Sequence, residues 1–168
     1  DVIDCSNCGF AHIIPLPEIR DKQDFYENTF YETYSDDYIK KHEEDMEWWE
    51  IEHKEKYTLY EEFLTIKDTP LTLLDIGSGP GYFLKTGESM GWNVTGIEPG
   101  DSAWKYSSEV LELNIHHAYY GDDNAETFGK FDVVHLNNVL EHVVSAQNFV
   151  KLAGGNLGKD GLISITSP

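Results

Sequence analysis

An apolar run followed by three glycines in five positions is the feature of this sequence that most restricts its fold. The segment 73–84 is LLDIGSGPGYFL. Its leucines and isoleucine predict a buried strand, and the apolar periodicity after Gly81 predicts the start of a helix. One glycine is enough for an ordinary turn, whereas three allow positive φ angles and let a ligand approach the backbone. The segment therefore predicts a ligand-binding loop between a strand and a helix N-terminus, at the carboxyl edge of a parallel sheet.

Strands and helices are predicted to alternate from Pro70 onward. We expect strands at 71–76, 92–97, 115–120, 131–136 and 162–166, and helices at 82–90, 101–113 and 145–157. This alternation is typical of an α/β fold with a doubly wound, mainly parallel sheet, so residues 70–168 are predicted to form one domain. Asp101 and Ser145 are the predicted N-caps, and Gly158 is predicted to end the last helix. Because a sheet ending there would leave an apolar edge uncovered, we expect the chain to continue beyond Pro168.

The first 69 residues are predicted to form an extension in two parts. Residues 1–34 are expected to be irregular and contain a short Cys5-x-x-Cys8 knuckle. Residues 35–69 are predicted to form an aromatic amphipathic helix that acts as a cap, with Ser35 as N-cap and Pro70 after its end. Its apolar and aromatic stripe has alternating three- and four-residue spacing: Ile39, His42, Met46, Trp49, His53, Tyr57, Tyr60 and Leu64.

The charge balance restricts the partners of the chain. The sequence has 31 acidic residues against 12 basic ones, a formal net charge of −19. Such a surface repels phosphate backbones, which argues against nucleic acid as a partner. No apolar run reaches the length of a membrane span and no secretory signal opens the sequence, so we expect a cytoplasmic protein without a membrane partner. The sequence leaves the oligomeric state open.

The spacing of the glycines distinguishes between classes of cofactor. A dinucleotide loop has the pattern G-x-G-x-x-G, whereas this loop is G-S-G-P-G, and Pro80 removes a backbone donor that a pyrophosphate would use. An NAD-dependent oxidoreductase is therefore disfavoured. The DIGSGPG motif resembles the signature loop of class I S-adenosylmethionine-dependent methyltransferases, a Rossmann-like family. The resemblance implies that the loop wraps the methionine part of the cofactor, with these residues at the site: Asp75, Gly77, Ser78, Gly79 and Gly81.

Glu98 is the second feature that fits this cofactor. It closes the second predicted strand in GIEPG, about 20 residues after the loop, where a carboxylate can accept both ribose hydroxyls. The family resemblance, which covers residues 71–168, extends the site to two further loops. Asp122 and Asp123 follow the third predicted strand, where family members hold the adenine amino group. Asn137 and Asn138 lie in HLNNVLEHV, which resembles the family segment that borders the cofactor.

Methyl transfer needs alignment of the acceptor more than covalent help, because the sulfonium is already activated. His142 could act as a general base for an acceptor that must lose a proton, or could orient its loop by local hydrogen bonds. In the family that the glycine loop resembles, the segment before that loop folds over the cofactor, which makes Tyr34 and Tyr38 candidates to face the sulfonium. A tyrosine ring suits that position because it offers an apolar wall and cation–π contact. The alternative for both is packing of the cap helix on the sheet.

The cysteine pair bears on the acceptor. The segment CSNCGFAHIIPLP resembles the zinc-binding N-terminal segment of bacterial methyltransferases that include sugar C-methyltransferases. Zinc needs four ligands, and Cys5 and Cys8 supply two. Either a longer protein supplies an upstream cysteine pair that completes a zinc site, or the site is vestigial. This resemblance favours a sugar or nucleotide-linked sugar as acceptor. A quinone-like or other small aromatic acceptor is the alternative, because family members with such acceptors share the VLEHV segment. A catalytically silent cofactor-binding module is a third.

Overall fold

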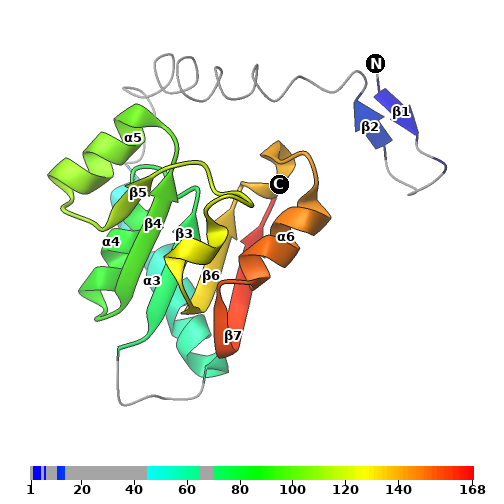
Figure 1. Cartoon of the computed structure of the whole chain (residues 1–168). Helices are drawn as coiled ribbons and strands as arrows, with labels where there is room; N and C mark the ends of the chain where they lie inside the picture. Colours follow the sequence, from blue (N-terminus) through cyan, green and yellow to red (C-terminus); the bar gives the residue numbers. More distant parts are fainter. Residues whose placement is uncertain (1, 5, 7–10, 14–44, 65–69) are drawn as a thin grey trace.

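The computed structural model describes residues 2–4, 6, 11–13, 45–64 and 70–168. Its centre is a five-stranded sheet with the order β5-β4-β3-β6-β7, and all neighbouring strands are parallel (Figure 1). The strands are β3 (Thr72–Ile76), β4 (Asn93–Glu98), β5 (Ile115–His117), β6 (Phe131–Asn137) and β7 (Leu157–Thr166). Since β3 pairs with β4 on one side and with β6 on the other, the strand order reverses beside β3. The predicted doubly wound parallel sheet is confirmed.

Helices cover both faces of this sheet, so its central strands are apolar on both sides. Leu73 and Val133 are fully buried on the face packed against α3 (Met46–Phe63) and α4 (Tyr82–Ser89). Leu74 and Val134 are fully buried on the other face, in a second cluster with residues of α6 (Ala146–Gly154). Figure 1 shows α6 in front of the sheet and α3 behind it.

The helix α3 confirms the apolar stripe from Met46 onward; Ile39 and His42 lie outside the described residues. Tyr57, Tyr60 and Leu64 are buried, and Trp49 and His53 are half-buried. The helix was predicted to reach residue 69 but ends at Phe63, because Leu64 has extended backbone angles (φ −88°, ψ 141°). The predicted start at Ser35 lies outside the described residues.

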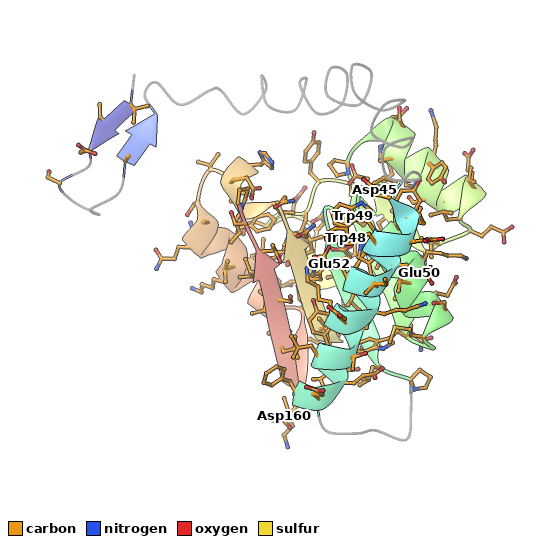
Figure 2. The ribbon with its side chains drawn as sticks, turned by 180° about the vertical axis from the view of Figure 1, so that it is seen from behind. Asp45, Trp48, Trp49, Glu50, Glu52 and Asp160 are labelled. Atoms are coloured by element: carbon orange, nitrogen blue, oxygen red, sulfur yellow. The ribbon has the colours of Figure 1, made fainter. Side chains whose placement is uncertain are left out.

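Helix α3 runs antiparallel to β7. Tyr60 donates a hydrogen bond to Ser164 at 2.7 Å, and Lys56, one turn earlier, donates to Thr166 at 3.4 Å. Figure 2 accordingly places Asp45 and Trp49, at the start of α3, toward the edge where the strands end, and Asp160 at the opposite edge. The beginning of α3 therefore lies at the carboxyl edge of the sheet.

Several predicted boundaries differ from the structure; β7, for example, begins at Leu157 rather than at residue 162. Ser145 caps α6 by accepting from the Asn148 N–H at 3.4 Å, as predicted. That helix nevertheless ends at Gly154 rather than near residue 157, and Gly158 lies in β7. The reason is Asn156, a buried side chain that donates to the carbonyls of Ala125 and Gly129 at 2.8 Å each and thereby fixes the turn.

The third predicted strand ends at His117 rather than Tyr120. Tyr120 is buried against the rest of the domain, and its hydroxyl donates to the Asn156 side chain at 2.6 Å. The next difference concerns α5 (Asp101–Lys105), which continues as a π-helical turn (Tyr106–Val110). Gly100, not Asp101, is the N-cap of α5, and the Asp101 carboxylate pairs with Lys105 at 2.9 Å instead of capping.

Two short strands lie within the N-terminal region that was predicted to be irregular. β1 (Val2–Asp4) pairs antiparallel with β2 (Ala11–Ile13), with Val2 opposite Ile13. Two 3₁₀ turns, at Ala125–Phe128 and Leu140–His142, complete the described elements. Within the described residues, no helix has the length and apolar character needed to cross a membrane.

Candidate functional site

The glycine loop, residues 77–81, joins β3 to α4 at the carboxyl edge of the sheet. Gly77, Gly79 and Gly81 have φ angles of 77°, 54° and 85°, the left-handed region that glycine adopts without strain. The N–H groups of Gly77 and Ser78 both donate to the carbonyl of Ile97, at 2.8 and 3.1 Å. The loop is thus anchored to the neighbouring strand β4, and its three glycines have the conformational reason that the sequence predicted.

The surroundings of the three glycines differ. A Cβ at Gly77 would lie 2.8 Å from Val139 Cγ2, and one at Gly81 would lie 2.8 Å from Leu113 Cδ1. A Cβ at Gly79 would meet nothing within 4 Å. Gly77 and Gly81 therefore permit close packing within the protein, whereas Gly79 borders open space that a ligand can occupy.

Glu98 lies at the end of β4 and contacts the glycine loop directly. Its side chain is only 3% exposed. One carboxylate oxygen accepts from the Gly79 N–H at 2.8 Å, and the other accepts from the Gly100 N–H at 2.7 Å. Because each carboxylate oxygen can accept more than one hydrogen bond, the group can also accept from hydroxyls of a ligand. The two features that the sequence singled out separately are therefore parts of one site.

Asp75, predicted as a site residue, pairs with a residue that the sequence analysis missed. His135 on β6 lies opposite Asp75 in the register of the sheet, and its Nδ1 is 2.8 Å from the Asp75 Oδ1. Both side chains are buried, at 3% and 2% exposed. A histidine in the otherwise apolar run of a central strand was the signal available in the sequence, since such strands are apolar on both faces.

The charge of Asp75 also acts on two tyrosines of α3. Burial raises the pKa of Tyr57 well above its usual range, with a further upward contribution from Asp75. Burial raises the pKa of Tyr60 to about 12, while its hydrogen bond to Ser164 lowers it and Asp75 raises it slightly further. The tyrosines therefore stay neutral and form the wall of the face on which Asp75 lies.

Asn137 and Asn138, predicted to border the ligand, lie at the carboxyl end of β6 beside the glycine loop. Asn137 is the exposed last residue of that strand. Asn138 has a positive φ of 54° and donates its N–H to the carbonyl of Thr166 at 2.9 Å. A left-handed conformation at a residue other than glycine is strained, and such strain is common at ligand sites. Val139 next to them packs on Gly77, so this loop and the glycine loop are in contact.

Asp122 and Asp123 are exposed in the turn after β5. The turn is held by Asn124, whose side-chain oxygen accepts from the Gly121 N–H at 3.0 Å and whose amide donates to Tyr119. Since β5 is parallel to β4, with His117 opposite Glu98, this turn lies at the same edge as the glycine loop. The predicted adenine-binding acids and Glu98 therefore share one edge.

The other predicted residues are placed less centrally or lie elsewhere. The Ser78 hydroxyl is buried against Gly96 of β4 rather than beside the open space at Gly79. His142 is exposed in the 3₁₀ turn, with its Nε2 4.0 Å from Glu141 Oε1. Tyr34, Tyr38, Cys5 and Cys8 lie outside the described residues. Within the parts that the structure describes, no group of three or more His, Cys, Asp or Glu side chains could hold a metal ion.

The comparisons with known proteins bear on the family and the fold of the chain. Residues 23–168 match the family model described as a methyltransferase domain, and the chain belongs to that family. The methyltransferase resemblance based on the glycine loop is thereby confirmed. The match begins after the cysteine pair, so it does not bear on the sugar methyltransferase resemblance.

Two curated relatives are named ubiquinone biosynthesis O-methyltransferase. The protein from Bradyrhizobium diazoefficiens is 29% identical over 100 residues, which are 58% of this chain and 40% of the relative. The protein from Paramagnetospirillum magneticum is 32% identical over 95 residues, 55% of this chain and 38% of the relative. The chain therefore spans about 40% of the length of these relatives.

Solved structures show the same fold. The plantazolicin methyltransferase BpumL in complex with SAH has a TM-score of 0.63 and 17% identity, covering 86% of this chain and 55% of that one. A SAM-dependent methyltransferase from Archaeoglobus fulgidus has a TM-score of 0.57 and 22% identity, covering 78% of this chain and 58% of that one. These likenesses confirm the α/β methyltransferase architecture.

Proposed function

We propose that this chain binds S-adenosylmethionine and transfers its methyl group to a small-molecule acceptor. The observation that carries the proposal is the contact between the Gly79 N–H and the Glu98 carboxylate, beside open space, at the point where the strand order reverses. In open α/β sheets this crevice is where ligands bind. Membership of the methyltransferase domain family supports the choice of cofactor over NAD, as does the spacing of the glycines.

The residues present fit this cofactor. Glu98 would accept the ribose hydroxyls, and the loop 77–81 would lie along the methionine part. Asp122 or Asp123, at the same edge, would accept from the adenine amino group. When bound, the cofactor supplies an activated methyl group on a sulfonium, so the protein needs no covalent intermediate. Its own residues must hold the ligand, exclude water and align the acceptor.

The proton of the acceptor is the remaining chemical task. A hydroxyl acceptor must lose its proton as the methyl group arrives, and a general base helps only if it reaches that proton. His142 is exposed in the loop after β6 and lies beside Glu141, so it is available either as base or as the residue that orients this loop. A His142→Asn variant separates the two: loss of a base changes the pH profile of turnover, whereas loss of an orienting contact changes the KM.

A quinone-like phenol is the acceptor that we propose first. It is supported by the names of the curated relatives, all ubiquinone biosynthesis O-methyltransferases, at 27 to 32% identity. A sugar acceptor rests on the segment around Cys5 and Cys8 alone, and so does a zinc ion in a longer protein. Both stay proposals, which turnover with each class of acceptor and metal analysis of the longer protein would test.

Calorimetry tests the cofactor directly. We expect the protein to bind S-adenosylmethionine and S-adenosylhomocysteine, and NAD to bind at least 100-fold more weakly. Binding of NAD without binding of the sulfonium would overturn the proposal. Formation of S-adenosylhomocysteine with a catechol-like acceptor, measured against a no-acceptor control, would exclude a silent module. Binding without turnover on any phenol or sugar would favour it.

A further inference from the structure

The pair formed by Asp75 and His135 spans the point at which the strand order reverses. Asp75 is on β3, two residues before Gly77, and His135 is at the registered position on β6, two residues before Asn137. Each residue therefore lies just beneath one of the two loops that meet at Gly77 and Val139. A contact between these side chains fixes the relative position of both loops.

The chemistry of the pair indicates which group donates the hydrogen bond and why a histidine is present at this position. A carboxylate only accepts hydrogen bonds, so the Nδ1 of His135 donates to the Asp75 Oδ1 at 2.8 Å. The imidazole packs against the Phe83 ring of α4, with the ring centroids 4.2 Å apart and the ring planes tilted by 30°. Its other nitrogen, Nε2, is buried and has no hydrogen-bond partner within the described parts of the chain. A buried polar atom without a partner is destabilising, and a valine, as at Val133 and Val134, would avoid this penalty. The contact with Asp75 is the reason the structure offers for a histidine here.

The order of the strands indicates which part of a cofactor lies above the pair. The strand order is β5-β4-β3-β6-β7. If the ribose lies at Glu98 on β4 and the adenine toward the turn after β5, as proposed above, the rest of the cofactor would extend the other way, over β3 toward β6. That remaining part is the methionine moiety, which carries an ammonium group. An acidic side chain beneath this position complements the charge.

We propose that His135 is a positioning residue for the amino-acid end of the cofactor site: by holding the Asp75 carboxylate, it fixes the charge and the two loops that receive the methionine moiety. This inference rests on the proposed function. The inference concerns His135 and the amino-acid end of the ligand only, so it can be tested separately from cofactor binding as a whole.

Three substitutions of His135 separate the hydrogen bond from the ring. His135→Asn keeps an amide donor near the position of Nδ1. His135→Gln keeps the same chemistry but moves the donor toward the position of Nε2, away from Asp75. His135→Phe keeps a ring packed against Phe83 and removes the donor altogether. If His135 only fills space, His135→Phe should preserve ligand binding best. If His135 positions Asp75, His135→Asn should preserve it best.

The measurement is calorimetric affinity for two ligands, S-adenosylmethionine and 5′-methylthioadenosine, which lacks the amino-acid part. We expect His135→Gln and His135→Phe to lower the affinity for S-adenosylmethionine by about 10- to 100-fold, the range expected for loss of a hydrogen bond to a charged group. Their affinity for methylthioadenosine should change less than about threefold, and His135→Asn should bind both ligands nearly as the wild type does. Glu98→Gln is the matched control, because it should lower the affinity for both ligands.

The outcomes distinguish the two proposals. Wild-type protein that binds neither ligand would overturn the proposed function, and the inference with it. The inference alone would be overturned by a different result: the wild type binds both ligands, and His135→Gln and His135→Phe lower the affinity for both ligands equally or for neither. If these two variants do not fold, Asp75→Asn decides the matter, because it keeps an oxygen that accepts from His135 and removes the charge. Loss of affinity for S-adenosylmethionine alone is then expected, and unchanged affinity would refute the positioning role.

Discussion

Replacing Gly79 by valine separates ligand binding from folding more cleanly than any other change in the loop. A Cβ added at Gly79 would meet no protein atom within 4 Å, so the change does not force a Cβ into the packed interior. The added side chain extends instead into the open space beside the Gly79 N–H and the Glu98 carboxylate. We therefore expect Gly79→Val to abolish binding of S-adenosylmethionine while the fold stays largely intact.

The effect on stability follows from the backbone angle. Gly79 has a φ of 54°, and a residue with a Cβ in this left-handed region costs about 1–2 kcal/mol. In a chain of this size each kcal/mol lowers the melting temperature by about 2–4 °C. The free energy of unfolding should therefore fall by only about 1–2 kcal/mol, measured by denaturant or thermal unfolding without ligand.

Gly91 provides a matched control. Its φ is 89°, and a Cβ there also meets nothing within 4 Å, but it lies between α4 and β4, at the amino edge of the sheet. Gly91→Val should carry a similar strain and leave the affinity for S-adenosylmethionine unchanged. By contrast, Gly81→Val should impair folding itself, because its Cβ would lie 2.8 Å from Leu113 Cδ1 and 2.9 Å from Ser107 Cβ. Calorimetry on the Gly79 and Gly91 variants is decisive: unchanged affinity in Gly79→Val would refute the placement of the ligand at this loop.

Three further predictions concern the site and the core. Glu98→Gln replaces one accepting oxygen by a donor, so one of the N–H groups of Gly79 and Gly100 loses its partner; we expect about 1–3 kcal/mol less stability and weaker ligand binding, and a variant as stable as the wild type would contradict this. Asn156→Ala removes three hydrogen bonds of a buried side chain and should lower the free energy of unfolding by about 2–4 kcal/mol, whereas Asn114→Ala, at an exposed position, should cost less than about 0.5 kcal/mol; equal effects in denaturant unfolding would show that Asn156 does not fix its turn. The pKa of Tyr60 is raised from 10.0 to about 12 in the folded state, so the contribution of this tyrosine to the free energy of unfolding is fully present below pH 10 and is lost as the pH rises toward 12. Tyr60→Phe should flatten this part of the curve of stability against pH. An unchanged slope would argue against the burial of the Tyr60 hydroxyl.

The sequence alone determined the features that depend on neighbouring residues. The apolar runs 71–76 and 131–136 specify strands because both faces of a central parallel strand are buried, and the three glycines specify a left-handed loop because other residues are strained there. The Ser145 cap was predictable for the same reason, since its partner Asn148 is three residues away. The family of the chain followed from the glycine-loop motif DIGSGPG at residues 75–81.

Only the tertiary structure decided the features that depend on partners far apart in the chain. Asp75 and His135 are 60 residues apart, and their contact exists because β6 pairs with β3 in one particular register. Asn156 ends α6 early through bonds to carbonyls 27 and 31 residues away, which outweigh the local tendency of the helix to continue. Strand order likewise placed Glu98 against the Gly79 N–H, 19 residues from it. Local patterns specify the elements, but the pairing of strands sets which buried polar groups meet, and these contacts build the site.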